Sequence, residues 1–596
     1  MNSTRSKALP ALGIFLTGLA SALALWWPMF KTEHSGWGDW QQFHHWWEVG
    51  VVSMRRFGEW PLWDPYHCGG VSQWGQPQAQ NFSPFYLITA LPFGTTLGHK
   101  LFLLIHHAIA WSGAYVVGRK HERCSPAGAF LAATIWTSSG VAAWDGAGGH
   151  STFLAFAWLP WLLFGWREAD KDIRYTVLVA AVMTEILLEG GTYPLPFSVI
   201  VMAFDTLTRV HRKNVKLVVR TGVVSVFLTL FLAAARWMPI YIAMSRHPRV
   251  ADDDDAIRFM EIVEMWTART HDWTWAGHHW VWAEYGSYVG WAALFLATLG
   301  IFAATSDGMR ESTMRRQRFA LIAGFVLFLA FSMGSHAPYW PFPLIAQRLP
   351  GIGNLRVPSR WQVVCTLYLG WLAGVALTHF EGWLSRKRFE RGTQWIKPIA
   401  PFVIAMAISI DIVATSIGVT DRWDGGPVGT AEREAPHLVA AYNYLGEYAN
   451  YPVRDVSTME CYDNVPWHRA TSLWVGQVPQ VRIVDADAEH PGTAFQTRSA
   501  DRLHSYWRTN YTAGADVELA TPGRVIFNQN YESQWHASVG TVVSDDLRLA
   551  VDLPAGRHRV RVRFEPDDMP YSLVMSGLGV LFSMAVLVIG RRRALA

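Results

Sequence analysis

Apolar and polar positions divide the chain into long apolar runs separated by short polar loops, with one long polar block near the C-terminus. A helix needs about 20 apolar residues to cross a bilayer, and fewer where it packs inside a bundle. The pattern therefore predicts a mainly α polytopic membrane protein with one attached extramembrane domain. The twelve predicted spans are 8–30, 99–117, 125–143, 151–166, 173–188, 193–209, 217–241, 286–305, 318–334, 359–379, 397–417 and 570–590.

Positive charge tests this topology independently, because Lys and Arg concentrate in cytoplasmic loops close to span ends. With a cytoplasmic N-terminus, every second predicted loop is basic and both termini lie on the cytoplasmic side of the inner membrane. The basic pieces are Arg5 and Lys7, Arg119-Lys120, Arg167 to Arg174, Arg209 to Lys216, Arg310 to Arg318, Arg386 to Arg391, and Arg591 to Arg593.

These spans divide the chain into three parts. Residues 1–417 form a transmembrane domain with a large first external loop at 31–98, residues 418–568 form an extracytoplasmic domain, and residues 569–596 form a last helix with a basic tail. The first span has small residues that resemble a signal-peptide cleavage site. Its apolar stretch is longer than a signal peptide requires, so we expect it to be retained.

Composition supports a membrane protein, since 51% of the residues are hydrophobic and 16% are charged, against roughly 25% charged in soluble domains. The four cysteines form no CxxC pair and show no Cys/His metal spacing, so a zinc site is not expected. Cys68 and Cys461 both fall on the oxidising side. A disulfide between them and two unrelated thiols both remain open at this stage.

The first external loop holds Asp39, directly before a stretch at 39–57 with aromatic residues at helical spacing. Such a helix is expected to lie along the membrane surface, with most of its aromatic side chains as interfacial anchors. A carboxylate at this position can take a proton from an acceptor hydroxyl. An Asp before a helix is also a favoured N-cap, so both interpretations stay open.

The loop at 335–358 leads into a span through Arg356-Val357-Pro358-Ser359-Arg360. Two arginines four residues apart at a helix start are suited to bind phosphate, because guanidinium groups match phosphate geometry and the helix N-terminus adds partial positive charge. The alternative is that both arginines contact lipid head groups. We favour a phosphate-binding role for both.

Other ionisable residues lie at predicted span ends, where charged groups usually face a cavity or the bundle interior. His150 and Glu189 could line the site or be satisfied locally, and Arg236 requires a buried anion or a water path. The run 252–255 could bind a divalent cation, although a solvated loop is the favoured interpretation.

The polar block 418–568 predicts an α+β, β-rich domain that caps the membrane site or helps bind the acceptor. A helix is expected near 436–448, and strands at 481–484, 523–531 and 535–540. Alternating residues at 547–553 and 557–564 around Pro554-Ala555-Gly556 predict a hairpin.

Several motifs occur together in an order that resembles the YfhO-type membrane proteins, a family of the GT-C glycosyltransferase superfamily. They are Asp39 with Gln42, Pro61-Leu62-Trp63-Asp64-Pro65-Tyr66 with Gly69-Gly70, Gly75-Gln76-Pro77-Gln78, Gly149-His150, Trp158-Leu159-Pro160, Tyr288-Val289-Gly290, Gly334 with Pro338, Arg356-Val357-Pro358-Ser359-Arg360, Asn530-Tyr531 with Trp535 and Ala537, and Leu553-Pro554-Ala555-Gly556. The resemblance runs along nearly the whole chain. This chain departs from the family at Asp64 and at Gly190-Gly191-Thr192-Tyr193-Pro194, which puts donor and acceptor specificity in doubt.

The resemblance implies a GT-C fold, a polyprenyl-phosphate-linked sugar as donor, and a catalytic aspartate in the first external loop that matches Asp39. The expected acceptor is an extracytoplasmic glycan, lipid or protein, and the other expected partners are membrane lipids rather than nucleic acid. No cofactor is firmly indicated, and a divalent cation stays open. The candidate substrate-binding residues are Arg356, Arg360, His150, Glu189, Gln42, Gln78 and His44.

The favoured hypothesis is therefore a glycosyltransferase that moves a sugar from a lipid phosphate to an external acceptor. A lipid or glycan transporter is the first alternative, but no internal repeat relates the two halves of the chain, as is common in transporters. The second alternative is a non-catalytic assembly protein in which Asp39 only caps a helix.

Overall fold

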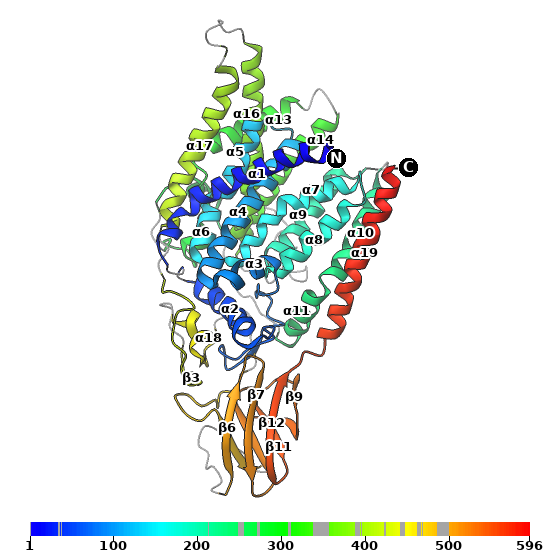
Figure 1. Cartoon of the computed structure of the whole chain (residues 1–596). Coiled ribbons are helices and arrows are strands. Elements are labelled where there is room, and N and C mark those ends of the chain that lie inside the picture. The colour runs from blue at the N-terminus through cyan, green and yellow to red at the C-terminus, as the bar shows by residue number, and fades with distance from the viewer. Residues whose placement is uncertain are drawn as a thin grey trace.

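The computed structural model shows a helix bundle joined to a β-sandwich (Figure 1). It describes residues 2–595 except 34–35, 37, 212–213, 248–255, 271–273, 308–311, 338–356, 388–393, 395, 422–424, 442–446, 462–466, 468 and 486–499. The candidate cation-binding run at 252–255 lies outside the described residues, as does most of the loop at 335–358.

Helices dominate the chain up to residue 421, and each predicted span falls on helical structure. The elements are α1 (Asn2–Trp26), η1 (Trp27–Lys31), α2 (Trp40–Val52), η2 (Ser53–Phe57), α3 (Pro84–Phe93), α4 (Thr95–Lys120), α5 (Pro126–Ser138), α6 (Gly140–Gly148), η3 (Ser151–Trp158), α7 (Leu159–Ala169), α8 (Tyr175–Leu188), α9 (Pro194–Arg209), α10 (Val215–Leu232), α11 (Ala234–Arg246), α12 (Phe259–Thr267), η4 (Trp282–Glu284), α13 (Trp291–Asp307), α14 (Ser312–Ser332), η5 (Gly334–His336), η6 (Pro358–Trp361), α16 (Gln362–Arg386), α17 (Ile396–Thr420) and, at the end of the chain, α19 (Met569–Leu595).

Among the described residues, six helical segments are long and apolar enough to cross a membrane. They are Pro10–Lys31, Thr95–Lys120, Val215–Leu232, Pro358–Arg386, Ile396–Thr420 and Met569–Arg591. The chain is thus an integral membrane protein, but the count of twelve spans is not confirmed. The sequence pattern joined segments that the fold separates. The predicted span 125–143 breaks at Ser139, where the backbone N–H of Gly140 donates to the carbonyl of Tyr288, and the span 217–241 breaks at Ala233.

The C-terminal region is β-rich, as predicted, and contains two four-stranded sheets. One has the strand order β10-β11-β8-β5 and the other β6-β7-β12-β9. The strands are β5 (Val481–Asp485), β6 (Arg502–Arg508), β7 (Thr512–Leu519), β8 (Gly523–Asn530), β9 (Trp535–Ala537), β10 (Thr541–Asp545), β11 (Arg548–Leu553) and β12 (Gly556–Phe564). The two sheets bury their facing apolar side chains in one core.

Two local predictions for this region are wrong. The predicted hairpin at 547–564 does not form, because β11 pairs with β8 and β10 whereas β12 pairs with β7 and β9. The turn at Pro554-Ala555-Gly556 instead carries the chain from one sheet to the other. The expected helix near 436–448 begins as β3 (His437–Val439), which pairs in parallel with β4 (Val456–Thr458). Between them lie η8 (Tyr448–Asn450) and α18 (Tyr451–Arg454).

The first external loop packs between the bundle and the β-sandwich (Figure 1). Every residue of α2 is buried, so the prediction that its aromatic side chains serve mainly as lipid anchors is wrong. The loop also forms β1 (Trp63–Asp64) and β2 (Val71–Ser72), and Trp63 lies in the sandwich core against Trp535 and Phe564. A disulfide joins Cys68 to Cys461. The loop and the β-rich region therefore form one packed unit.

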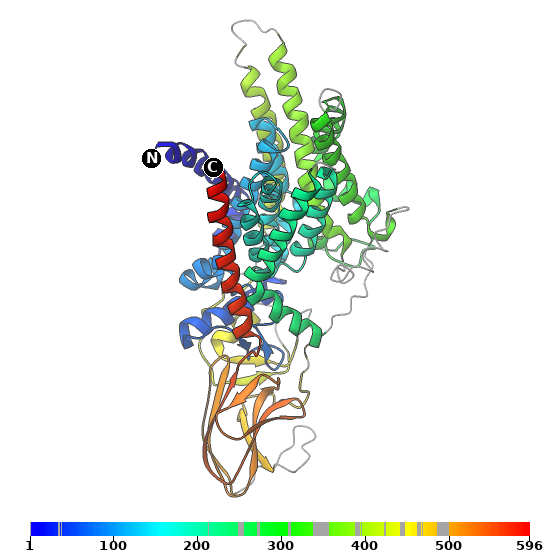
Figure 2. The same cartoon turned by 90° about the vertical axis from the view of Figure 1, so that its right-hand side faces the viewer.

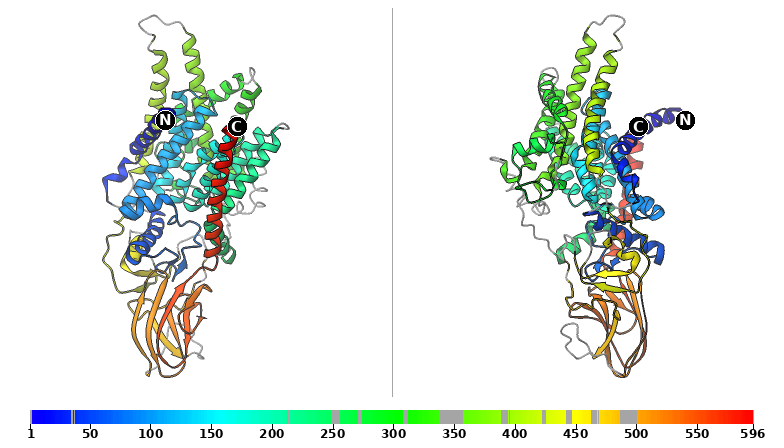
Figure 3. Two further views of the ribbon diagram at one scale, coloured as in Figure 1. Left: turned by 45° about the vertical axis from the view of Figure 1, so that its right-hand side comes forward. Right: turned by 90° about the vertical axis from the view of Figure 1, so that its left-hand side faces the viewer.

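Both chain termini lie toward the end of the bundle that is away from the β-sandwich (Figures 1 and 2). The last helix, α19, runs from the sandwich back along α10 and α11, and the views in Figure 3 agree on this placement. The hairpin of α16 and α17 projects beyond the other helices at the end opposite the sandwich. The bundle thus has one end next to the β-rich region and one end next to the termini.

Candidate active site at the sandwich end of the bundle

Asp39 lies at the start of α2 with its side chain partly open to solvent. It holds the N-cap position, yet its side chain accepts no capping hydrogen bond from the first turn of the helix. The side chain is 39% exposed, whereas every residue of α2 itself is buried. A role limited to capping, the alternative left open by the sequence, does not fit this geometry.

His150 connects Asp39 to other charged groups. Its Nε2 atom lies 3.8 Å from Oδ2 of Asp39 and 3.5 Å from Oε1 of Glu284. Its Nδ1 atom forms a 3.1 Å hydrogen bond with Oδ1 of Asp145 on α6. Three carboxylates thus surround one imidazole ring, at the point where α6 gives way to η3.

The preceding glycine explains how His150 comes so close to α2. Gly149 has a φ of +90°, and a β-carbon added there would lie 2.2 Å from the backbone nitrogen of Trp40. Only glycine adopts this conformation readily and leaves room for the backbone of α2. The close approach of Gly149 to the backbone of α2 therefore positions His150 beside Asp39.

Arg360 joins the same cluster from η6, at the start of α16. Its Nε and Nη2 atoms donate hydrogen bonds of 2.8 and 2.6 Å to the carboxylate of Glu284. The guanidinium also lies over the rings of Phe153 and Tyr193, at 5.0 and 4.3 Å from their centroids. This bidentate and stacked geometry fixes the orientation of the guanidinium.

The charges of this cluster control the protonation of His150. Burial alone lowers the pKa of the ring, but the charge of Glu284, the hydrogen bond and charge of Asp145, and the charge of Asp39 together raise it to about 9. The ring is therefore an imidazolium near neutral pH.

We call this group the outer cluster: Asp39, Asp145, His150, Glu284 and Arg360. Three of its members were predicted from the sequence, and the fold links them through direct contacts. Arg356, the other predicted arginine, lies outside the described residues. No group of three or more His, Cys, Asp or Glu side chains that could hold a metal ion occurs among the residues that the structure describes.

The other predicted site residues have different surroundings. Glu189 is fully buried and accepts hydrogen bonds from Nε2 of His106 at 2.6 Å and Nε1 of Trp158 at 3.0 Å. It thus belongs to a neighbouring polar group rather than to the outer cluster. Gln78 approaches the same turn, because its carbonyl would lie 2.6 Å from a β-carbon on Gly190.

Gln42 and His44 are buried in α2. The ring of His44 stacks on Trp40 and tilts against His99, with centroids 5.1 and 4.7 Å apart. These contacts account for His44 through packing. Arg236 is also satisfied without an anion: it donates to the backbone carbonyls of Trp74, Gln76, Ala79 and Leu187. The expectation of a buried anion or a water path at this position is therefore wrong.

Sequence reasoning missed Glu284 and Asp145. Both are acidic residues that immediately flank predicted spans, which is the signal that singled out His150 and Glu189. Phe153 and Tyr193, which hold the Arg360 guanidinium, carry no comparable signal because aromatic residues are abundant throughout the chain.

An apolar cavity of about 80 Å³ adjoins the outer cluster. Asp145 and Phe153 line it at the cluster, and the rest of its wall is largely apolar, with Trp26, Leu103, Trp136, Val141, Phe156 and Val363 among its members. The cavity lies between helices of the bundle, so apolar volume is available directly behind the charged groups.

The fold and this cluster define an integral membrane protein with a charged site at the sandwich end of its bundle. No protein family and no curated protein matches the chain. Among solved structures, the chain is similar to the arabinofuranosyltransferase AftD from Mycobacteria, at 12% identity and a TM-score of 0.48 over 94% of this chain and 40% of that one. It is also similar to the Archaeoglobus fulgidus oligosaccharyltransferase in its apo form, at 12% identity and a TM-score of 0.45 over 76% of this chain and 64% of that one. The chain thus spans less than two thirds of the length of each.

Proposed function

We propose that this protein is a membrane glycosyltransferase of the GT-C type, which moves a sugar from a polyprenyl-phosphate-linked donor to an extracytoplasmic acceptor. The observation that carries the proposal is the outer cluster, in which a partly exposed carboxylate and a fixed guanidinium flank one imidazolium. The resemblance to YfhO-type proteins supports the same assignment. The sandwich end of the bundle is then extracytoplasmic, and both termini are cytoplasmic.

Asp39 is proposed as the general base. It takes the proton of the acceptor hydroxyl while the hydroxyl oxygen forms a bond to the anomeric carbon of the sugar. The bond between that carbon and the donor phosphate breaks in the same displacement, and the phosphate leaves with the electron pair. His150, whose Nε2 atom lies 3.8 Å from Oδ2 of Asp39, is proposed to position this carboxylate.

Arg360 is proposed to stabilise the departing phosphate. Glu284 occupies its Nε and Nη2 atoms, and the Nη1 atom remains to donate to a phosphate oxygen. Positive charge fixed in advance at the leaving group lowers the barrier, because it needs no rearrangement during the reaction. Arg356, four residues earlier in the chain, is proposed to add a second guanidinium.

The apolar residues behind Asp145 and Phe153 are compatible with a lipid-linked donor, and their cavity of about 80 Å³ has room for only a short part of a polyprenyl chain. A polyprenyl chain has no hydrogen-bonding groups, so it binds to an apolar wall and leaves its phosphate at the polar end. The adjoining charged cluster provides such an end.

The test is Asp39→Asn, assayed by transfer of a radiolabelled sugar from polyprenyl phosphate in vesicles that hold the purified chain. Loss of a general base lowers rates by about 100- to 10,000-fold, so transfer is expected to fall by at least 100-fold. Asp421→Asn serves as the control, because Asp421 is an exposed residue that pairs with Lys31 away from the cluster. Transfer by Asp39→Asn within a few fold of wild type, with equal protein in the vesicles, would overturn the proposal and favour a transporter or an assembly protein.

A further inference from the structure

A second cavity, of about 630 Å³, lies at the end of the bundle away from the β-sandwich. Its volume falls within the range of about 300–1,000 Å³ that small-molecule sites occupy. It opens among the ends of α4, α7, α9 and α14, and α16 closes one side. Its lining residues are His121, Glu122, Arg167, Asp170, Lys171, Phe204, Asp205, Thr208, Arg209, His211, Asn214, Arg316, Gln317, Ala320, Leu321 and Tyr368.

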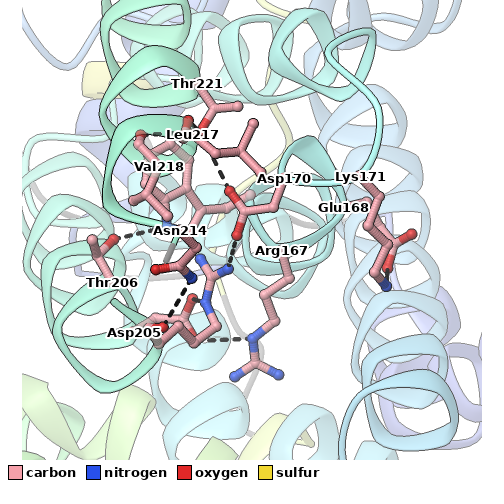
Figure 4. A network of polar contacts seen from close by, with 12 residues as sticks. Arg167, Glu168, Asp170, Lys171, Asp205, Thr206, Asn214, Leu217, Val218 and Thr221 are labelled. Atoms are coloured by element: carbon pink, nitrogen blue, oxygen red, sulfur yellow. Dashed lines mark hydrogen bonds and ion pairs between the residues drawn. The ribbon is translucent and has the colours of Figure 1, made fainter. Parts of the chain in front are cut away.

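Ion pairs organise the wall of this cavity. Asp205 accepts a 2.9 Å hydrogen bond from Nε of Arg167 and a 2.7 Å hydrogen bond from Nε of Arg209. Arg167 also donates to Glu122, and Arg209 to Asp170, both at 2.6 Å. Figure 4 shows Arg167 and Asp170 close to Asp205, while Lys171 and Glu168 stand apart from them. Each carboxylate of the cavity wall is thus already bound to an arginine.

The lining of the cavity holds four Lys or Arg side chains and three carboxylates. Arg167, Lys171, Arg209 and Arg316 line it against the carboxylates of Glu122, Asp170 and Asp205. Lys171 and Arg316 are exposed, and Lys171 contacts Glu168, which is not part of the lining. The Nζ atom of Lys171 is paired with Glu168 at 2.9 Å, so a ligand that enters here meets Arg316 as an exposed cation of the lining.

Part of the lining of the cavity is apolar or aromatic. Phe204, Ala320, Leu321 and Tyr368 line it, and they come from three different helices. A basic region next to an apolar wall, at the end of a bundle that crosses a membrane, suits a ligand with an anionic group on an apolar body.

We propose that this cavity is a second binding site, distinct from the outer cluster, for the phosphate group of an anionic ligand. The same chemistry is present in the head group of an anionic phospholipid and in a free phosphate ester. The site goes beyond the proposed transferase activity, and its occupancy does not depend on sugar transfer.

The experiment is native mass spectrometry of the full chain purified in detergent, with phosphatidylglycerol as the anionic probe and phosphatidylcholine of equal chain length as the neutral one. The wild-type chain is expected to retain more phosphatidylglycerol than phosphatidylcholine. Arg316→Gln is expected to weaken that binding by about five-fold, the effect of removing one basic residue near a lipid phosphate. Arg316 is exposed, so its substitution leaves the fold intact.

Arg315→Gln is the matched control, because Arg315 is the adjacent exposed residue of α14 and does not line the cavity. A loss in Arg316→Gln but not in Arg315→Gln supports a lipid head group. Thermal stabilisation of wild type by millimolar inorganic phosphate, reduced in Arg316→Gln and without a lipid preference, supports a free phosphate ester. Equal losses in both variants, or no binding of either probe, would overturn the proposal.

Discussion

The two ends of the helix bundle hold charged clusters that differ in how closely their carboxylates are paired with basic side chains. At the end near the termini, Asp205 is held by two arginines at hydrogen-bond distance. In the outer cluster, three carboxylates surround one imidazole and one guanidinium, and Oδ2 of Asp39 lies 3.8 Å from the imidazole. Closely matched pairs fix structure, whereas a partly exposed acid beside a titratable ring can exchange a proton.

Helix α9 connects the two clusters. Tyr193, its N-cap residue, lies against Arg360, and Arg209 ends the helix in the second cavity. The helix has 16 residues, which corresponds to a length of about 24 Å. The contrast between the ends therefore exists within one packed bundle, so substitutions can test it in the same protein.

The largest effect on stability is expected in the cluster near the termini, where Asp205 is paired with two arginines. Asp205→Ala removes the buried carboxylate that Arg167 and Arg209 share, and it leaves these partly buried arginines with one carboxylate each, Glu122 and Asp170. Breaking a buried pair in this way costs about 3–5 kcal/mol. Thermal unfolding in detergent measures the change, with the exposed Asp567→Ala as control. A fall in stability no larger than that of the control would show that the pairing is not structural.

The next effect concerns pH and the outer cluster. The pKa of folded His150 is about 9, above the ordinary value of 6.5, so the folded state binds the extra proton between these values. The stabilisation is fully present below pH 6.5 and is lost as the pH rises through about 9. The contribution of His150 to the free energy of unfolding therefore falls by at most about 3 kcal/mol over this pH range. Unfolding midpoints at pH 7 and 9.5 measure it, and His150→Gln is expected to remove this part of the pH dependence.

The exposed His536→Gln on β9 is the control for that comparison, and it should keep the pH dependence of wild type. If His150→Gln keeps the full dependence as well, other groups titrate in this range and the ring is not the source.

A smaller effect is expected from the backbone contact that positions His150. Gly149→Ala places a methyl group against the backbone of α2 and forces alanine into a left-handed conformation, at a cost of roughly 1–3 kcal/mol. Because His150 moves away from Asp39, sugar transfer should fall together with stability. Gly418→Ala on α17, where a β-carbon meets no atom within 4 Å, should leave both unchanged or slightly improved. Normal transfer by Gly149→Ala would show that this contact is dispensable.

The smallest effect on stability is expected at Asp39 itself. Asp39→Asn makes no new overlap and removes no capping hydrogen bond, so its unfolding free energy should stay within about 0.5 kcal/mol of wild type. The same variant is expected to lose sugar transfer, which separates a functional carboxylate from a structural one. A loss of stability of several kcal/mol would instead show that Asp39, like Asp205, has a structural role.

Sequence reasoning identified the parts of this molecule that depend on local pattern. Helical structure at each predicted span and the β-rich C-terminal region follow from apolar periodicity. Asp39 was selected as a carboxylate in the first external loop, Arg360 as one of two arginines at a helix start, and His150 as an ionisable group at a span end. Their convergence on one cluster, however, is set by how the helices pack, and Glu284 and Asp145 enter it only through that packing.

The errors have the same origin. Alternation at 547–564 indicates two strands but does not say with which strands they pair, and each finds its partners in a different sheet. The aromatic spacing of 39–57 predicts a helix with an apolar face, and it is equally compatible with a lipid surface and with a protein interior. The β-rich region covers α2, and that contact is made by residues roughly 400 positions away, such as Tyr448.

The disulfide between Cys68 and Cys461 also has a consequence for biosynthesis. The two cysteines are 393 residues apart, and translation at about 5–20 residues per second separates their emergence by roughly 20–80 seconds. During that interval the first thiol stays reduced or is temporarily protected, while most of the bundle inserts between the two. Premature oxidation of Cys68 would prevent it from forming the disulfide with Cys461. Maturation of this protein therefore depends on when the oxidant acts as well as where.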